Sequence, residues 1–126
     1  MSQAQIKAIY SKDKYKIHLD LSLYAWHEEG IYYIYSPALD LTGYGTTAKE
    51  AKESFSITLK EFVEYTDNKK TIFDELEHLG WLVNRNRKKV HAPDFEELLN
   101  ENDTLKSIIN KNGVKKIEKN IELALA

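Results

Sequence analysis

The stretch YKIHLDLSLYAW, residues 15–26, alternates between two kinds of side chain without a break. One series is apolar and the other is polar over most of its length: Tyr15, Ile17, Leu19, Leu21, Leu23 and Ala25 against Lys16, His18, Asp20 and Ser22. Successive side chains of a strand point to opposite faces of a sheet, so a period of two predicts a β-strand with one buried face. The buried face needs a second layer to cover it, which makes this strand decisive for the fold.

The residues after this strand predict a β-hairpin and a third strand. Residues 27–30, HEEG, end in glycine, which tolerates positive φ, and residues 31–35, IYYIY, are rich in β-prone side chains. Pro37 ends the second strand because proline cannot donate a hydrogen bond to the ladder. Residues 39–41 then offer a short third strand before Gly43, so we expect a three-stranded meander.

Two amphipathic helices are expected next. Thr47 and Glu50 match a capping box, in which the threonine oxygen accepts from an early helix amide and the glutamate reaches back to the cap amide. Apolar residues then recur at helical spacing over about residues 48–66, so this helix can cover the sheet: Ala51, Phe55, Leu59, Phe62 and Val63. A second capping pattern at Thr71 and Asp74 predicts a shorter helix that ends near Gly80.

The rest of the chain predicts short elements. Residues 81–83 favour a strand that closes the sheet, and the apolar stripes within 95–109 fit two short helices or one broken helix equally well. Alternation after Gly113 predicts a C-terminal strand. We therefore expect an α+β fold, with a small, mainly antiparallel sheet of three to four strands under the first helix. The expected domain is 1–83, and 84–126 form a helical and strand extension packed on it.

The composition limits the possible functions. The chain has 126 residues, of which 42% are hydrophobic and 30% charged, as in an ordinary single globular domain. It has no cysteine, which excludes disulfides, thiol nucleophiles and thiolate metal sites. Its net charge of −2 is too near neutral to require a nucleic-acid partner. We find no signal-peptide pattern and no apolar stretch of roughly 18 residues, so we expect a cytoplasmic protein that makes no membrane contact.

The segment YIYSPALDLTGYGTT, residues 33–47, followed by Glu50-Ala51 and an amphipathic helix, resembles the HicB-type antitoxin family. The shared pattern is an aromatic strand, a Pro-x-Leu turn, a Gly-x-Gly-x-Thr helix cap and Glu-Ala, and the resemblance covers roughly residues 15–83. It implies a HicB-like fold related to part of the ribonuclease H architecture. It also implies an antitoxin of a type II toxin–antitoxin pair. Such an antitoxin binds a small, basic, HicA-like toxin that cleaves messenger RNA, and neutralises it by covering the toxin's catalytic histidine.

Members of that family are similar in carrying a C-terminal DNA-binding module, usually ribbon-helix-helix or helix-turn-helix. The extension expected here runs helix, helix, strand, which fits neither module, so DNA binding is doubtful. Two alternatives stay open. One is a stand-alone oligomeric binding module that has the fold but no toxin partner. The other is a metal-dependent nuclease that uses Asp20, Asp40 and Glu50. We expect no catalysis, because these residues are predicted on an outward strand position, in a turn and in a helix cap.

Candidate contact residues fall into two groups. Strands with aromatic side chains on both faces often bury one face in the core and the other against a partner. A second copy of this chain is one such partner. The basic cluster after Trp81 could bind phosphate, with the indole stacked on an unpaired base, although a solvated basic loop is the simpler alternative. The partner contacts are predicted at Tyr24, Tyr32, Tyr33, Tyr35, Tyr44 and Trp81, and the nucleic-acid contacts at Arg85, Arg87, Lys88 and Lys89.

No motif predicts a cofactor or a metal. Gly43 and Gly45 lack the third glycine and the lysine–serine pair of phosphate-binding loops, so we interpret them as a turn into the helix. The four histidines lack metal-ligand spacing, although His18 and His27 could meet across the hairpin. We therefore expect neither a cofactor nor a metal site.

Overall fold

The computed structural model describes residues 15–125 and confirms the α+β class. In chain order its elements are β1 (Tyr15–Glu28), β2 (Ile31–Ser36), β3 (Leu41–Gly45), α2 (Ala48–Asn68), α3 (Ile72–His78), β4 (Leu82–Asn84), β5 (Lys89–His91), α4 (Phe95–Glu101), α5 (Asp103–Ile109) and β6 (Lys115–Leu125). Four strands form an antiparallel sheet in the order β3-β2-β1-β6, and β4 pairs with β5 in a separate ribbon. No helix in these residues is long and apolar enough to cross a membrane.

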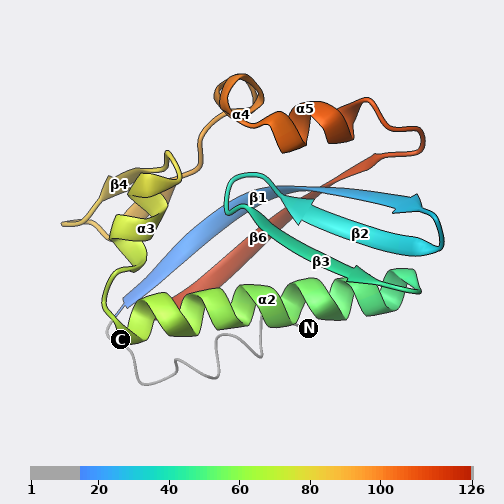
Figure 1. Cartoon of the computed structure of the whole chain (residues 1–126). Coiled ribbons are helices and arrows are strands. Elements are labelled where there is room, and N and C mark those ends of the chain that lie inside the picture. The colour runs from blue at the N-terminus through green and yellow to red at the C-terminus, as the bar shows by residue number, and fades with distance from the viewer. Residues whose placement is uncertain (1–14, 126) are drawn as a thin grey trace.

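The sheet lies between two helical layers, with α2 on one side and α4 and α5 on the other (Figure 1). The alternation in β1 sorts its side chains as expected. One side of the sheet packs against the buried side of α2, and we call it the apolar face. Its β1 residues are at most 4% exposed: Ile17, Leu19, Leu21 and Leu23. His18, Asp20, Ser22 and Tyr24 lie on the opposite face, which we call the polar face.

Strand β1 organises the sheet because it pairs along both of its edges. Residues 15–25 pair with β6 and residues 24–28 pair with β2. The β1–β2 connection has only two residues, Glu29 and Gly30, with φ of 52° and 81°. Positive φ at both central positions is typical of a type I′ hairpin turn, whose twist matches that of the flanking strands. The predicted hairpin is therefore confirmed.

Helix α2 packs directly against the edge strand β3 through glycine. A Cβ atom placed on Gly43 would lie 2.4 Å from the backbone nitrogen of Phe55, so no side chain fits there. At the start of α2, Thr47 Oγ1 accepts from the Glu50 amide at 3.1 Å. The Glu50 carboxylate accepts from the amide and hydroxyl of Thr46, one residue earlier than in the expected capping box. These bonds lower the pKa of Glu50. The expected turn at Gly43 and Gly45 was wrong: both glycines lie in β3, which spans Leu41–Gly45, and their lack of a side chain lets α2 pack closely on this strand.

The fourth strand of the main sheet is β6, and the prediction that residues 81–83 close this sheet was wrong. Gly80, with φ of 92°, ends α3 and turns the chain so that the Trp81 amide donates to the Leu76 carbonyl at 2.9 Å. The Trp81 indole then donates to the Ala38 carbonyl at 2.7 Å. That bond holds this segment beside the β2–β3 turn, where β4 pairs with β5. The segments 1–83 and 84–126 thus share one sheet, because β6 belongs to the second of them.

Helices α4 and α5 cover one end of the polar face. A second, smaller core forms there, with Tyr24 and Tyr35 from the sheet and Leu105 and Ile108 from α5. The sequence left open whether residues 95–109 form two short helices or one broken helix. The structure has two short helices, separated by Asn102. The extension was predicted to run helix, helix, strand. The structure adds β5 before the two helices, so residues 84–126 run strand, helix, helix, strand.

Candidate partner-binding site

A polar network anchors the α4–α5 layer to the sheet. The Tyr35 hydroxyl donates to Asp40 Oδ1 at 2.8 Å and accepts from Asn102 Nδ2 at 2.9 Å. Asn102 Oδ1 accepts from the Leu105 amide at 2.9 Å and so caps α5. Burial raises the pKa of Tyr35 to about 12; the Asn102 bond opposes this rise and the Asp40 bond adds to it. The network therefore positions α5 and the acidic helix α4 against the turn that follows β2.

Helix α4 begins at a capping box that the sequence analysis overlooked. Asp94 Oδ1 accepts from the Glu97 amide at 2.9 Å, and the Glu97 carboxylate accepts from the Asp94 amide at 3.1 Å. The signal was present as Asp-x-x-Glu before an apolar pair. Because both carboxylates are used at the helix start, the acidic end of α4 is held in place.

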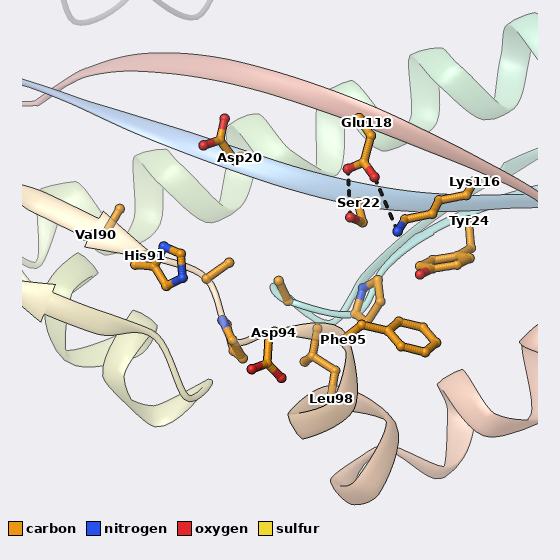
Figure 2. Close-up of a pocket in the computed structure, with 14 residues that line it drawn as sticks. Asp20, Ser22, Tyr24, Val90, His91, Asp94, Phe95, Leu98, Lys116 and Glu118 are labelled. Atoms are coloured by element: carbon orange, nitrogen blue, oxygen red, sulfur yellow. Dashed lines mark hydrogen bonds and ion pairs between the residues drawn. The ribbon is translucent and has the colours of Figure 1, made fainter.

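Two adjoining hollows, of about 310 and 650 Å³, lie where this layer meets the sheet. Pro37, Pro93 and Leu98 line both of them, and we call the pair the acidic groove. Figure 2 shows the first hollow, with β1 and β6 on one side and the segment from β5 into α4 on the other. The groove is lined by seven carboxylates and one lysine: Asp20, Asp40, Asp94, Glu97, Glu101, Asp103, Glu118 and Lys116.

Cross-strand bonds order the sheet wall of the groove. Ser22 Oγ donates to Glu118 Oε1 at 2.8 Å, and Lys116 Nζ lies 3.3 Å from Glu118 Oε2 (Figure 2). The serine bond is the largest cause that lowers the pKa of Glu118, and Lys116 lowers it further. Asn120 Nδ2 donates to Asp20 Oδ1. The wall thus presents the Glu118 carboxylate in its charged form at neutral pH, on a two-stranded surface.

The helical wall adds mainly negative charge, and Lys106 of α5 lies 3.8 Å from Asp103. Residues 94–103 contain Asp94, Glu96, Glu97, Glu101 and Asp103, without a lysine or arginine. A concave surface with many charges of one sign attracts molecules of the opposite charge and raises their rate of association. The groove is therefore suited to bind a cationic partner surface, and its run of acids was a sequence signal that our aromatic and basic candidates did not include.

Most of the predicted aromatic contacts are used inside the chain. Tyr24 and Tyr35 are buried in the second core, and Trp81 is buried on the Ala38 carbonyl, so these three do not offer a surface to a partner. Tyr33 stacks on Trp26 at 5.0 Å, and Tyr32 stacks on His27 at 4.2 Å on the other face of the sheet. Tyr44, at the sheet edge, is 64% exposed. Aromatic character alone therefore did not distinguish core positions from contact positions.

The basic cluster lies on the β4–β5 ribbon. Arg85 forms ion pairs with Asp74 at 2.7 Å and with Glu77 at 2.6 Å, and its guanidinium lies over the Phe73 ring at 5.7 Å. Lys88 Nζ donates to the Arg85 carbonyl. Arg87 and Lys89 are exposed. Arg85 thus tethers the ribbon to α3, and Asp74 serves this ion pair instead of the second capping box that we expected.

The residues of the metal and nuclease alternatives are not grouped as metal ligands: Asp20 and Asp40 line different hollows of the acidic groove, and Glu50 lies outside it. Asp20 is bonded to Asn120, Asp40 to Tyr35, and Glu50 to Thr46 at the start of α2. His18 lies on the polar face, 3.6 Å from Glu122, whereas His27 lies on the apolar face, so the two histidines do not meet across the hairpin. Within residues 15–125, no three histidine or carboxylate side chains are grouped as metal ligands.

Comparisons with known proteins add no relative: no family model, no curated protein and no solved structure matches the chain.

Proposed function

We propose that this protein is a HicB-like antitoxin that binds and neutralises a small, basic, messenger-RNA-cleaving toxin. The observation that carries the proposal is the acidic groove, because seven carboxylates against one lysine complement a basic surface. The α+β fold with a sheet under one long helix is compatible with the resemblance at residues 33–47. Binding, rather than catalysis, is the proposed activity.

In this proposal the toxin's basic surface lies along the groove and contacts both of its walls. The sheet wall supplies Asp20 and Glu118, and the helical wall supplies Glu97, Glu101 and Asp103. Apolar side chains at the floor, Val90, Ala92 and Leu98, allow the stems of lysine or arginine to pack while their charged ends meet the carboxylates. The protein would thereby cover the toxin's catalytic histidine.

The first experiment is a pull-down of the tagged protein from its native cytoplasm, with the bound species identified by mass spectrometry. Recovery of one small basic protein at equal stoichiometry, and loss of its ribonuclease activity in the complex, is the expected result. Glu101→Lys should weaken capture by reversing a groove charge, whereas Glu29→Lys, at the distant β1–β2 turn, makes the same change of charge and should not. Recovery of the bait alone would contradict the antitoxin function.

The alternative function, a stand-alone oligomeric module, has an observation of its own in its favour. Ile57 projects from the outer side of α2 and is 57% exposed, on a helix whose other side is buried in the core. Purified protein that forms a defined oligomer and recovers no second protein from its cytoplasm would favour this alternative.

A further inference from the structure

The outer side of α2 carries a charge pattern that is complementary to itself. We define the seam as Lys49, Glu53, Ser56, Ile57, Lys60 and Glu64, which follow one another at the spacing of one helix side. In chain order its charged members alternate positive, negative, positive, negative, with Ser56 and Ile57 at the centre. In the reverse order the signs are inverted. A second copy of α2 laid antiparallel would therefore bring every seam charge opposite its counter-charge.

The seam is available for such pairing. Its members are exposed except Ser56 and Glu64, which are partly exposed, and Ile57 is the apolar residue at its centre. Across the part of the chain that the structure describes, no ion pair involves Lys49, Glu53, Lys60 or Glu64. The helix itself is firmly seated, because Phe55, Leu59 and Val63 on its inner side are at most 5% exposed. The seam is thus a rigid surface with unused charges.

We propose that two copies of this chain associate through α2, with the two helices antiparallel about a two-fold axis between Ser56 and Ile57. Glu53 then faces Lys60 of the second copy, and Lys49 faces Glu64, each pair occurring twice by symmetry. Ile57 lies next to the axis, where it loses its exposure to water. A parallel arrangement would instead set each charge against its own copy, so the charge pattern selects the antiparallel one.

The two-fold axis makes a charge-swap experiment decisive. Lys60→Glu places two carboxylates opposite each other at two places, and should weaken the dimer at least about tenfold in sedimentation equilibrium. The double variant Glu53→Lys with Lys60→Glu restores opposite charges across the axis and should recover wild-type association. Arg87→Glu, an equal change of charge on the β4–β5 ribbon, is the matched control and should dimerise normally.

A cysteine near the axis tests the geometry independently of affinity. The natural chain has no cysteine, so Ser56→Cys introduces one thiol per copy. Mild oxidation should link it into a covalent dimer, because the two copies of position 56 lie next to the axis and therefore near each other. Asn112→Cys, exposed in the α5–β6 connection, should not be linked at the same protein concentration.

Other results would overturn the proposal. A chain that stays monomeric at all concentrations would do so, and would leave the seam to a different protein. A dimer that Lys60→Glu does not weaken, or that the charge swap does not restore, would place the interface elsewhere. The inference does not depend on a toxin, so purified protein can pass this test even where the pull-down recovers the bait alone.

Discussion

The two faces of the four-stranded sheet are covered in different ways. On the apolar face, one helix of 21 residues buries a regular stripe against the leucines of β1. On the polar face, two helices of seven residues each rest on a small core around Tyr24 and Tyr35 and on the hydrogen bonds of Asn102. The first face supplies most of the buried apolar area, and hence stability. The second leaves charged side chains at its border, where a partner can reach them.

This contrast predicts a difference in cooperativity. Regions with few buried apolar contacts open locally at a free-energy cost below that of global unfolding. The α4–α5 layer meets that description, whereas α2 does not. The acidic groove thus has one rigid wall, the sheet, and one wall that can detach, and the following substitutions separate the two.

The largest effect is expected from Leu21→Ala on the apolar face. Leu21 is 1% exposed, so truncation leaves a cavity and should lower the free energy of unfolding by about 3 kcal/mol. Leu105→Ala, in the second core, removes the same atoms from a side chain that is equally buried. The loss in free energy of unfolding caused by Leu105→Ala should be smaller, because α4 and α5 can detach without unfolding the rest of the chain. Hydrogen exchange should therefore accelerate throughout the chain in the first variant, and only within residues 95–109 in the second; global acceleration in both would remove the distinction between the faces.

Gly43→Ala tests how closely α2 approaches the sheet edge. The new Cβ would lie 2.4 Å from the Phe55 backbone nitrogen, which cannot move aside as a side chain could. We expect a loss of roughly 2–3 kcal/mol from displacement of the helix, measured by chemical denaturation. Gly30→Ala is not a matched control, because positive φ at Gly30 would add backbone strain of its own. The matched control is Thr42→Ala, at an exposed position on the same strand as Gly43. Equal stability of the two variants would show that α2 can shift without cost.

The comparison also explains which parts of the fold the sequence could predict. The alternation of residues 15–26 and the helical stripe from Ala51 to Val63 are local periodicities, and both elements formed as predicted. The pairing of β6 with β1 joins residues about a hundred positions apart. The sequence near residues 81–83 is equally compatible with a strand beside β1, so local pattern could not exclude it from that position. Local pattern specifies which element forms more readily than which elements meet.

The candidate site shows the same limit at single residues. Trp81 was predicted as a contact residue, yet its acceptor is the carbonyl of Ala38, 43 positions earlier in the chain. Its neighbour Leu82 is the exposed one, at 71%. By contrast, the acids of residues 94–103 and the capping box at Asp94 are local features that could have been recognised. Burial of an aromatic side chain is decided by tertiary contacts. A run of like charges, by contrast, produces a charged surface in whatever element it forms.

Asn102→Ala should loosen the helical wall of the groove. The substitution removes the cap of α5 and the amide that donates to the Tyr35 hydroxyl. We expect a loss of about 1–2 kcal/mol, seen mainly as faster hydrogen exchange of α5. Asn102→Asp keeps the cap acceptor but loses the donor, and so should fall between wild type and alanine. If aspartate matches alanine, the cap contributes little and the Tyr35 bond carries the effect.

The smallest effect at neutral pH, and the most specific one, is expected from Tyr35→Phe. Removing the hydroxyl should cost about 1 kcal/mol at pH 7. Because the folded state raises the pKa of Tyr35 from 10.0 to about 12, the unfolded state loses its phenol proton first as the pH rises. The free energy of unfolding should therefore fall between about pH 10 and pH 12 in the wild type, in addition to the loss from other groups. Phenylalanine cannot ionise, so the variant should lose less stability over this range, and the two curves should converge. Parallel curves in denaturant titrations at pH 9, 10 and 11 would mean that the hydroxyl ionises as readily in the fold as in the unfolded chain, and that the α4–α5 wall does not seal it from water.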